Sequence, residues 1–382
     1  MSRVLIITGE ASGDLHGANL AKALKALAPD VSVIGVGGGR MREAGVDLVP
    51  GIPQVDVIGM VGPTRVRAVA RRILTLRRLL QREPLDLVVL IDQPGLNFHF
   101  ARIAKRAGRR VVYYIAPQLW AWRPGRMRWM QRRVDHVVVI LPFEAELYRR
   151  AGVPCTFVGH PLLDDMAPSY DREQIRAALG LPRDARVIGL LPGSRPGEVQ
   201  AMLPLMLEAV RLLQRDCGPL RAVLAVAETV NEEDIKRLCV GAGLDVGLVT
   251  RDPNGVMAAS DLILAASGTA TLQAAIIGTP MVIVYKLPWI PYLLGRLLVR
   301  GVQSIGLANI VAGRAFIPEL IQRQATPVRL AAEARRILED SPYQEAMRAE
   351  MARVRTLLGT PGASARAAAV VLRQLRPAEA RA

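Results

Sequence analysis

An aspartate, Asp92, ends a very apolar segment of the sequence, LVVLID. A carboxylate at the carboxyl end of a buried parallel strand is partly desolvated, which raises its pKa and suits it to act as a general base. Asp is also a common N-cap of the helix that follows such a strand. On this segment alone, the helix cap is the favoured interpretation.

Two glycine-containing segments in the second half could bind phosphate groups. In LPGSRPGEV, Gly193 and Ser194 offer backbone and hydroxyl donors, and Arg195 offers a guanidinium to a diphosphate. A second segment carries a glycine and three hydroxyl side chains at a predicted helix start: Ser267, Gly268, Thr269 and Thr271. Either segment alone is explained by an N-cap, but two in one half favour a phosphate or diphosphate site.

Two segments of the first half could line a substrate cleft. GEASGD follows the first apolar segment, and a tight turn explains it as well as a binding loop does. APQLWAWR has two tryptophans close to several arginines, a combination that can bind a sugar, a phosphate or lipid headgroups. Core packing is the alternative, above all for Trp129. With one residue from IDQPGLN, the candidate cleft residues are Glu10, Ser12, Gly13, Asn97, Trp120 and Trp122.

Short aliphatic segments alternate with helical patterns twice along the chain, which predicts two parallel sheets with helices on both faces. The first group of predicted strands is Val4–Thr8, Val31–Val36, Leu87–Asp92, Val111–Ile115, His136–Ile140 and Cys155–Val158. The second is Val187–Leu191, Ala222–Val226, Asp261–Ala265 and Met281–Tyr285.

Residues Pro161–Asp184 supply Pro and acidic residues suited to a linker and then a helix N-cap. We therefore expect an α/β protein of two Rossmann-like, doubly wound domains, residues 1–165 and 166–345, facing each other across a cleft. Residues 346–382 are predicted to form C-terminal helices that pack on these domains. Ligands of such folds bind beyond the carboxyl ends of the strands.

The composition combines strong basicity with high hydrophobicity. The 382 residues include 50 Lys and Arg against 34 Asp and Glu, a net charge of +16, and 51% are hydrophobic. A membrane surface is the partner that suits both properties, although the sequence predicts no membrane-spanning helix. Most of the excess positive charge lies in residues 1–160. Three widely spaced cysteines and the absence of a leader indicate a protein that stays in a reducing compartment.

Seven motifs occur in the order and spacing typical of one enzyme family: GEASGD, IDQPGLN, APQLWAWR, FVGHPL, LPGSRPGEV, SGTATLQAAIIGTPMVIVYK and IGLANIVAGRAFIPELIQ. They cover nearly the whole chain, which on these motifs resembles the lipid-A-disaccharide synthase family. The resemblance implies the GT-B fold of glycosyltransferases. It also implies a peripheral protein on the cytoplasmic face of the bacterial inner membrane.

The reaction that the resemblance implies is an inverting transfer of 2,3-diacylglucosamine from UDP-2,3-diacylglucosamine to 2,3-diacylglucosamine 1-phosphate (lipid X). The products are a β-1,6-linked disaccharide and UDP. No cofactor and no metal are implied, and the four histidines form no metal-binding motif. The expected partners are the two lipid substrates and an anionic membrane surface. The oligomeric state stays open, with a homodimer among the states of the family.

By resemblance, Asp92 is the base that deprotonates the acceptor 6-hydroxyl, and Arg195 lies near the UDP diphosphate. The donor residues extend to Asn309 and Gln322. Gln273 stands where the family has a ribose-binding glutamate. Two further departures are Gly95-Leu96 in place of Asp-Phe, and Ala308 in place of proline.

Residues Arg65–Arg82 predict an amphipathic helix with most of its arginines beside or opposite an apolar stripe. Such a helix can lie in the headgroup layer of a membrane or can simply cover a sheet. The candidate membrane contacts are Val66, Val69, Arg72, Ile73, Leu76 and Leu80. A second apolar candidate for lipid or subunit contact is Trp289–Val299.

The fold and the basic composition are also compatible with two other functions. A UDP-sugar epimerase or a soluble glycosyltransferase would share the fold but would not need the basic amphipathic helix. A nucleic-acid-binding protein would explain the basic composition, but the sequence has no RNP, KH or helix-turn-helix motif. We therefore expect no nucleic acid partner.

Overall fold

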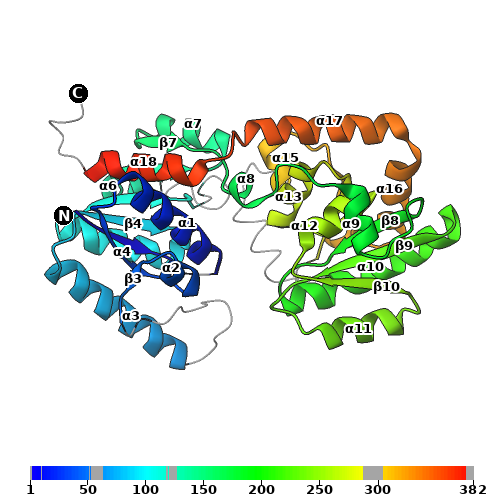
Figure 1. The fold of residues 1–382 in the computed structure, drawn as a ribbon, viewed down its shortest axis with the longest axis horizontal. Helices are drawn as coiled ribbons and strands as arrows, with labels where there is room; N and C mark the ends of the chain where they lie inside the picture. Colours follow the sequence, from blue (N-terminus) through cyan, green and yellow to red (C-terminus); the bar gives the residue numbers. More distant parts are fainter. Residues whose placement is uncertain are drawn as a thin grey trace. The chain divides into compact units, whose positions relative to one another are not determined.

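The computed structural model describes residues 2–9, 11–50, 52, 63–117, 119, 127–286 and 304–375. The chain forms two compact units (Figure 1). Unit 1 comprises Met1–Asp165 with Leu358–Ala382, and unit 2 comprises Met166–Leu357. The first division falls between residues 165 and 166, where the sequence analysis places a boundary. The C-terminal segment is shared, because α17 (Ser341–Leu357) belongs to unit 2 and α18 (Ala363–Leu375) to unit 1.

Unit 1 is built on a seven-stranded parallel sheet in the order β3-β2-β1-β4-β5-β6-β7. Its strands are β1 (Arg3–Ile7), β2 (Ser32–Val36), β3 (Asp47–Leu48), β4 (Leu87–Ile91), β5 (Arg110–Tyr114), β6 (His136–Val139) and β7 (Cys155–Phe157). Its helices are α1 (Ala11–Leu27), α2 (Gly39–Glu43), α3 (Pro63–Arg82), α4 (Pro94–Arg106), α6 (Met127–Arg133), α7 (Pro142–Arg150), α8 (Leu162–Asp165) and α18.

The core of unit 1 lies on both faces of this sheet, because successive side chains of a strand point to opposite faces. Val88 and Leu90 of β4 join one apolar cluster with α3, α4, α6 and α7. Leu87, Val89 and Ile91 join a second cluster with α1, α2 and α18. Every residue of β4 is therefore buried, which explains why the strand reads as a continuous apolar run.

Unit 2 has a six-stranded parallel sheet in the order β10-β9-β8-β11-β12-β13. Its strands are β8 (Arg186–Leu191), β9 (Leu220–Val226), β10 (Val246–Thr250), β11 (Leu262–Ala266), β12 (Met281–Tyr285) and β13 (Glu319–Ile321). Its helices are α9 (Arg172–Ala178), α10 (Pro196–Cys217), α11 (Glu232–Gly241), α12 (Pro253–Ala259), α13 (Thr269–Ile277), α15 (Leu307–Ala312), η2 (Gln322–Gln324), α16 (Pro327–Glu339) and α17.

The prediction of two doubly wound α/β domains is confirmed, and so are the ten predicted strands, to within a residue or two at their ends. Three strands, β3, β10 and β13, were not predicted; all three lie at the edges of their sheets. Edge strands bury fewer side chains, so their apolar pattern is weaker. The predicted N-cap after the linker is also confirmed, because the Asp171 carboxylate accepts a hydrogen bond from the Gln174 amide, 3.0 Å away.

Candidate functional site

The motifs whose residues could carry out chemistry lie at two positions, one in each sheet. In unit 1 the strand order reverses between β1 and β4, which are hydrogen-bonded neighbours. In unit 2 it reverses between β8 and β11. The loops that follow these four strands contain GEASGD, Asp92, LPGSR and SGTAT respectively. Ligands of open α/β sheets bind at such reversal points, beyond the carboxyl ends of the strands.

Asp92 lies directly after β4 in a strained turn. Its φ is +48° and that of the next residue, Gln93, is +42°, a region that L-residues seldom adopt. Gln93, not Asp92, is the N-cap of α4, and its side chain forms no capping hydrogen bond. The helix-cap interpretation of the Asp92 carboxylate is therefore wrong, and the carboxylate is left for another role.

The strained turn is held through the Asp92 backbone. The Asp92 carbonyl oxygen accepts hydrogen bonds from the Asn97 amide, at 2.7 Å, and from the Tyr113 hydroxyl, also at 2.7 Å. Asn97 is fully buried and also donates to the Ile91 carbonyl, 2.9 Å away. Asn97, expected as a cleft residue, thus has its amide N–H groups committed to positioning Asp92.

Burial is the main influence on the ionisable groups around Asp92. It raises the pKa of the Asp92 carboxyl, against the opposing effects of the Gln93 backbone N–H and of nearby His16. Burial also lowers the pKa of His16, while Asp92 opposes that shift. A partly buried carboxyl with a raised pKa, beside an imidazole that burial keeps neutral, is suited to accept a proton near neutral pH. His16 was missed as a site residue, and only its proximity to GEASGD in the sequence could have suggested it.

The first loop of unit 1 is closely packed. A Cβ atom on Gly13 would lie 3.2 Å from the Thr8 Cβ, and Ser12 is exposed. Asp14 accepts backbone hydrogen bonds from Gly38, at 2.6 Å, and Arg40, at 3.0 Å, so it caps α2. The final acid of GEASGD is thus structural. Glu10, Trp120 and Trp122 lie outside the described residues.

His160 follows β7 and is buried. Its Nδ1 accepts a hydrogen bond from the Leu162 amide, 3.2 Å away, and its own amide donates to the Leu358 carbonyl, 2.9 Å away. His160 therefore joins the segment that leaves unit 1 to the segment that returns to it. Burial, with a smaller contribution from His16, lowers the pKa of His160 to about 4.

The low pKa of His160 makes the folding stability depend on pH. At pH values between the usual histidine pKa and about 4, His160 is protonated in the unfolded chain but not in the folded chain. The free energy of unfolding therefore falls as the pH falls through this range. The expected loss is about 3 kcal/mol between pH 7 and pH 4. His160→Asn keeps a hydrogen-bond acceptor for the Leu162 amide. Its free energy of unfolding in urea should fall less between pH 7 and pH 4 than that of the wild type. The same change at exposed His99 is the control, and equal losses in both variants would contradict the prediction.

In unit 2, the LPGSR loop joins β8 to α10. Arg195 is the N-cap of α10 and is exposed, and its Nη1 lies 2.9 Å from the Glu198 Oε1. Gly193 has φ +113°, and a Cβ atom there would lie 2.8 Å from the Glu198 Oε2. Glu198 also hydrogen-bonds Tyr285 and, after burial, helps to raise the pKa of that hydroxyl. Sequence reasoning missed both residues, although Glu198 belongs to the LPGSRPGEV motif.

The second loop of unit 2, after β11, has some free and some committed hydroxyls. Thr269 is exposed, as are Gly268, the N-cap of α13, and Ser194 in the LPGSR loop after β8. Ser267 donates to the Ile305 carbonyl at 3.0 Å, and buried Thr271 donates to the Gly268 carbonyl at 2.8 Å. Thr271 is thus structural. Ser194 and Thr269 extend from neighbouring loops at one edge of the sheet, since β8 and β11 are adjacent.

Three further residues were predicted to bind the UDP-sugar: Gln273, Asn309 and Gln322. Gln273 donates to the Asn254 Oδ1 at 3.2 Å, and Gln322, with φ +53°, follows β13 at the same edge of the sheet. Asn309 is buried, and its amide donates to Glu319 at 2.7 Å and to the Ile317 carbonyl at 2.9 Å. Its oxygen accepts from the Ile317 amide, 3.0 Å away. Asn309 therefore fixes α15 to β13 rather than facing a ligand.

The described part of the apolar stripe of α3 faces the protein core. Leu76 and Leu80 are completely buried in the cluster against the sheet of unit 1, and Ile73 packs against it. Their predicted contact with a membrane is wrong, because covering the sheet removes the same apolar surface from water. The side chains of Val66, Val69 and Arg72, and the segment Trp289–Val299, lie outside what the structure describes.

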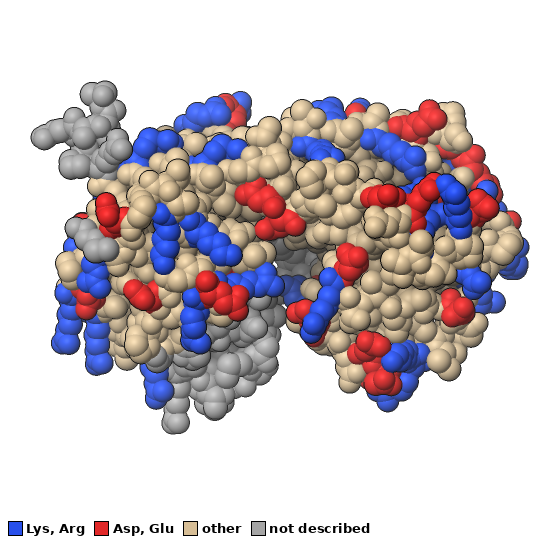
Figure 2. Space-filling model, viewed as in Figure 1, with Lys and Arg blue, Asp and Glu red and all other residues tan. Residues whose placement is uncertain are grey.

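The outward face of α3 is strongly basic, with Leu74 half exposed among arginines. The exposed arginines in its described part are Arg71, Arg77, Arg78 and Arg82. On the visible face of unit 1, Lys and Arg side chains predominate over Asp and Glu (Figure 2). The excess basic charge expected in the first half is therefore on the surface.

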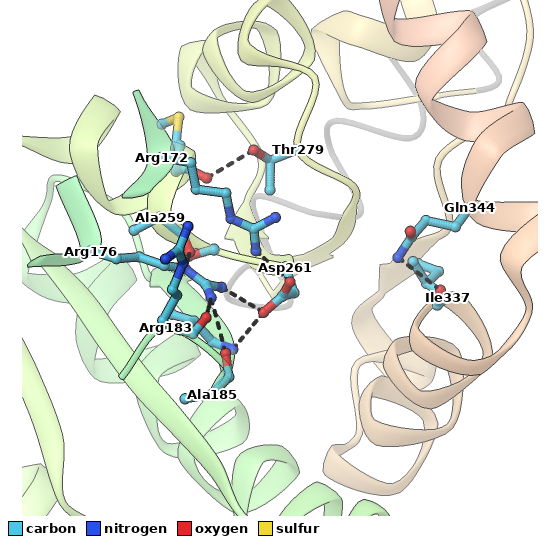
Figure 3. Close-up of polar contacts among 12 residues, drawn as sticks. Arg172, Arg176, Arg183, Ala185, Ala259, Asp261, Thr279, Ile337 and Gln344 are labelled. Atoms are coloured by element: carbon cyan, nitrogen blue, oxygen red, sulfur yellow. Dashed lines mark hydrogen bonds and ion pairs between the residues drawn. The ribbon is translucent and has the colours of Figure 1, made fainter. Parts of the chain in front are cut away.

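A cavity of about 540 Å³ lies at the opposite, amino edge of the sheet in unit 2. Arg172 and Arg176 point toward the Asp261 carboxylate there (Figure 3), and the Arg176 Nη2 is 2.8 Å from it. The Val187 amide donates to the same carboxylate at 2.8 Å. Because both arginines pair with the Asp261 carboxylate and anchor α9 to β8, the cavity is a structural feature and not the candidate site.

The described residues contain neither a metal-binding cluster nor a membrane-spanning helix. No group of three or more His, Cys, Asp and Glu residues in these parts of the chain is placed to hold one metal ion. No helix in the same parts combines the length and the apolar character needed to cross a lipid bilayer.

Known proteins that resemble the chain fall into two sets. Residues 4–372 match the family model described as lipid-A-disaccharide synthetase. A lipid-A-disaccharide synthase from Geobacter sulfurreducens is 44% identical over 98% of this chain and 97% of its own length. One from Coxiella burnetii is 38% identical over 96% and 97% respectively.

Solved structures share the fold at low identity. A UDP-N-acetylglucosamine 2-epimerase from Listeria monocytogenes superposes with a TM-score of 0.66 at 17% identity, covering 97% of this chain and 95% of its own. An Anabaena protein solved with UDP-glucose has a TM-score of 0.58 at 15% identity, covering 97% and 99%. These likenesses concern architecture alone, whereas the family match spans the motifs. The chain belongs to the lipid-A-disaccharide synthase family, and it is a glycosyltransferase of lipid A biosynthesis.

Proposed function

We propose that the protein transfers 2,3-diacylglucosamine from UDP-2,3-diacylglucosamine to the 6-hydroxyl of 2,3-diacylglucosamine 1-phosphate. The products are the β-1,6-linked disaccharide 1-phosphate and UDP. The observation that carries the proposal is the Asp92 carboxylate, which follows β4 at the strand-order reversal and is not used as a helix cap. The family membership gives the reaction class, and Asp92 supplies the group that this reaction needs.

In the proposed mechanism the acceptor oxygen attacks the anomeric carbon of the donor sugar in a single displacement. The acceptor hydroxyl gives its proton to the Asp92 carboxylate while the bond between the anomeric carbon and UDP breaks. The configuration at that carbon inverts. The raised pKa of Asp92 favours this role, because a more basic carboxylate is a better proton acceptor.

Unit 2 holds UDP in this proposal. The leaving diphosphate gains negative charge, and donors fixed before the reaction can stabilise it. Arg195, the exposed hydroxyls of Ser194 and Thr269, and the backbone N–H groups at the start of α13 are available at the carboxyl edge of the sheet. We propose that these groups replace a metal ion as the source of charge stabilisation, so that turnover continues in the presence of EDTA.

We propose that the outward face of α3 contacts an anionic membrane surface and that the enzyme works on the cytoplasmic face of the inner membrane. Its exposed arginines can bind lipid phosphates, and the half-exposed Leu74 can enter the headgroup layer. This surface differs from the one predicted from the sequence, because the apolar stripe is buried and the basic face is not.

Charge reversal on α3 should weaken binding to anionic vesicles. Each basic residue near such a surface contributes about 1 kcal/mol, so Arg71→Glu with Arg78→Glu should lower the partition coefficient roughly thirty-fold or more at low salt. Cosedimentation with phosphatidylglycerol vesicles measures it. Arg149→Glu with Arg150→Glu on α7 makes the same change in net charge on exposed residues of unit 1. Equal losses in both variants would show that only net charge matters.

Mass spectrometry tests the proposed reaction. Purified protein, UDP-2,3-diacylglucosamine and 2,3-diacylglucosamine 1-phosphate, with EDTA present, should yield the disaccharide 1-phosphate and UDP. Incubation with UDP-N-acetylglucosamine alone should give no epimer, which separates the reaction from that of the epimerases with the same fold. An epimer without a disaccharide would overturn the proposal. Mass photometry of the same preparation would show whether the protein forms a homodimer.

A further inference from the structure

The side chain of Gln93 has a buried amide with no hydrogen-bond partner in the part of the chain that the structure describes. Gln93 is only 9% exposed. Among the described residues, neither its Nε2 nor its Oε1 has a hydrogen-bond partner. A buried amide that forms no hydrogen bond is costly, and most buried polar groups are paired. An unpaired amide beside a candidate catalytic group therefore calls for a ligand.

The amide lies against the loop that follows β1. A Cβ atom on Gly9 would be 1.5 Å from the Gln93 Oε1 and 2.5 Å from its Nε2, so only glycine leaves room for this amide. Since β1 and β4 are hydrogen-bonded neighbours, the amide lies at the strand-order reversal of unit 1. The buried Nδ1 of His16 is a further polar atom without a partner within the described residues.

The backbone at Asp92 and Gln93 is held in place by two hydrogen bonds from Asn97. The Asn97 backbone N–H donates to the Gln93 carbonyl at 3.2 Å, and the Asn97 side chain donates to the Asp92 carbonyl at 2.7 Å. The left-handed conformation of Gln93 is thus maintained by buried contacts. A polar group held by rigid surroundings before its ligand arrives loses little entropy on binding.

We propose that the Gln93 amide is a recognition group for the acceptor sugar. Its Nε2 donates to, and its Oε1 accepts from, polar groups of the sugar ring beside the hydroxyl that Asp92 deprotonates. A primary amide combines a donor and an acceptor within one plane, which matches ring hydroxyl groups and the N-acyl amide of a glucosamine. The inference rests on the proposed function, because it takes the acceptor site to be next to Asp92.

The test is equilibrium binding of a short-chain 2,3-diacylglucosamine 1-phosphate, measured by titration calorimetry without donor. Gln93→Met keeps the chain length and removes both polar atoms. It should raise the acceptor Kd at least tenfold, leave the Kd for UDP within twofold, and leave the melting temperature unchanged or higher. A purely structural role would lower the melting temperature and leave the acceptor Kd unchanged.

Gln93→Ala, which cannot overfill the site, should show the same loss and decides the matter if Gln93→Met fails to fold. An acceptor Kd within twofold of the wild type in either folded variant overturns the role of Gln93. If the wild-type protein itself does not bind this acceptor, the proposed function fails instead. The two failures are therefore distinguishable.

Discussion

Replacing Asp92 with asparagine is expected to lower kcat by about 10²- to 10⁴-fold, the usual contribution of a general base. The amide has almost the same size as the carboxyl but cannot accept the proton of the acceptor hydroxyl. The turn should keep its conformation, because Asn97 and Tyr113 bind the Asp92 backbone oxygen and not its side chain. Binding of UDP should be unchanged, since the proposed UDP-binding residues belong to unit 2. Initial rates and calorimetry measure the two effects.

Asp30→Asn is the matched control, because Asp30 is an exposed residue of unit 1 just before β2, at the amino edge of the sheet. It should retain wild-type turnover. In the wild type, kcat/KM should fall as the pH decreases through the Asp92 pKa, which burial raises above its ordinary value. Protonation removes the base, so this acidic limb should be absent in Asp92→Asn. Unchanged turnover in that variant would rule out the role of Asp92.

Replacing Arg195 with alanine is expected to raise the Kd for UDP about 10- to 100-fold, the effect of losing a charge-assisted hydrogen bond. In the structure the guanidinium pairs with Glu198 at 2.9 Å on an exposed surface. Such pairs contribute little to stability, so a diphosphate can replace Glu198 as the partner. Arg195→Lys should bind UDP with intermediate affinity, because it keeps the charge but not the two-pronged geometry.

Arg211→Ala is the control for this prediction. Arg211 lies on α10, the helix that Arg195 caps, and is as exposed as Arg195. It pairs with Glu208, three residues before it, at 2.6 Å. Both variants should have the melting temperature of the wild type. Only Arg195→Ala should lose affinity for UDP in calorimetric titrations. Similar UDP affinities in the two variants would mean that Arg195 does not contact the diphosphate.

Much of the fold was predictable because central parallel strands are buried on both faces. Val88 and Leu90 pack on one side of β4, and Leu87, Val89 and Ile91 on the other, so the sequence there is continuously apolar. The edge strands β3 and β10 carry weaker signals and were missed. The position of Asp92 was predictable for the same reason, since it is the first polar residue after such a run.

The roles of individual polar side chains were less predictable. Three residues predicted to bind ligand instead have polar groups that hydrogen-bond the backbone or a neighbouring side chain: Asn97, Thr271 and Asn309. A motif preserves the types of residues around a site but not the direction in which each side chain points. That direction depends on hydrogen bonds with segments distant in the sequence, such as the one between Asn309 and Glu319.

The sequence by itself determined the two sheets, the family and the edges of the sheets where the chemistry lies, because strand periodicity and loop motifs are local properties. Tertiary structure alone decided that Asp92 is not a helix cap and that, in the described part of α3, the arginines and not the apolar stripe face outward. It also decided that the Gln93 amide lies over Gly9 with no hydrogen-bond partner among the described residues. The physical reason is the same in each case. Burial and pairing of a side chain depend on which distant segments cover it, and those neighbours exist only in the folded chain.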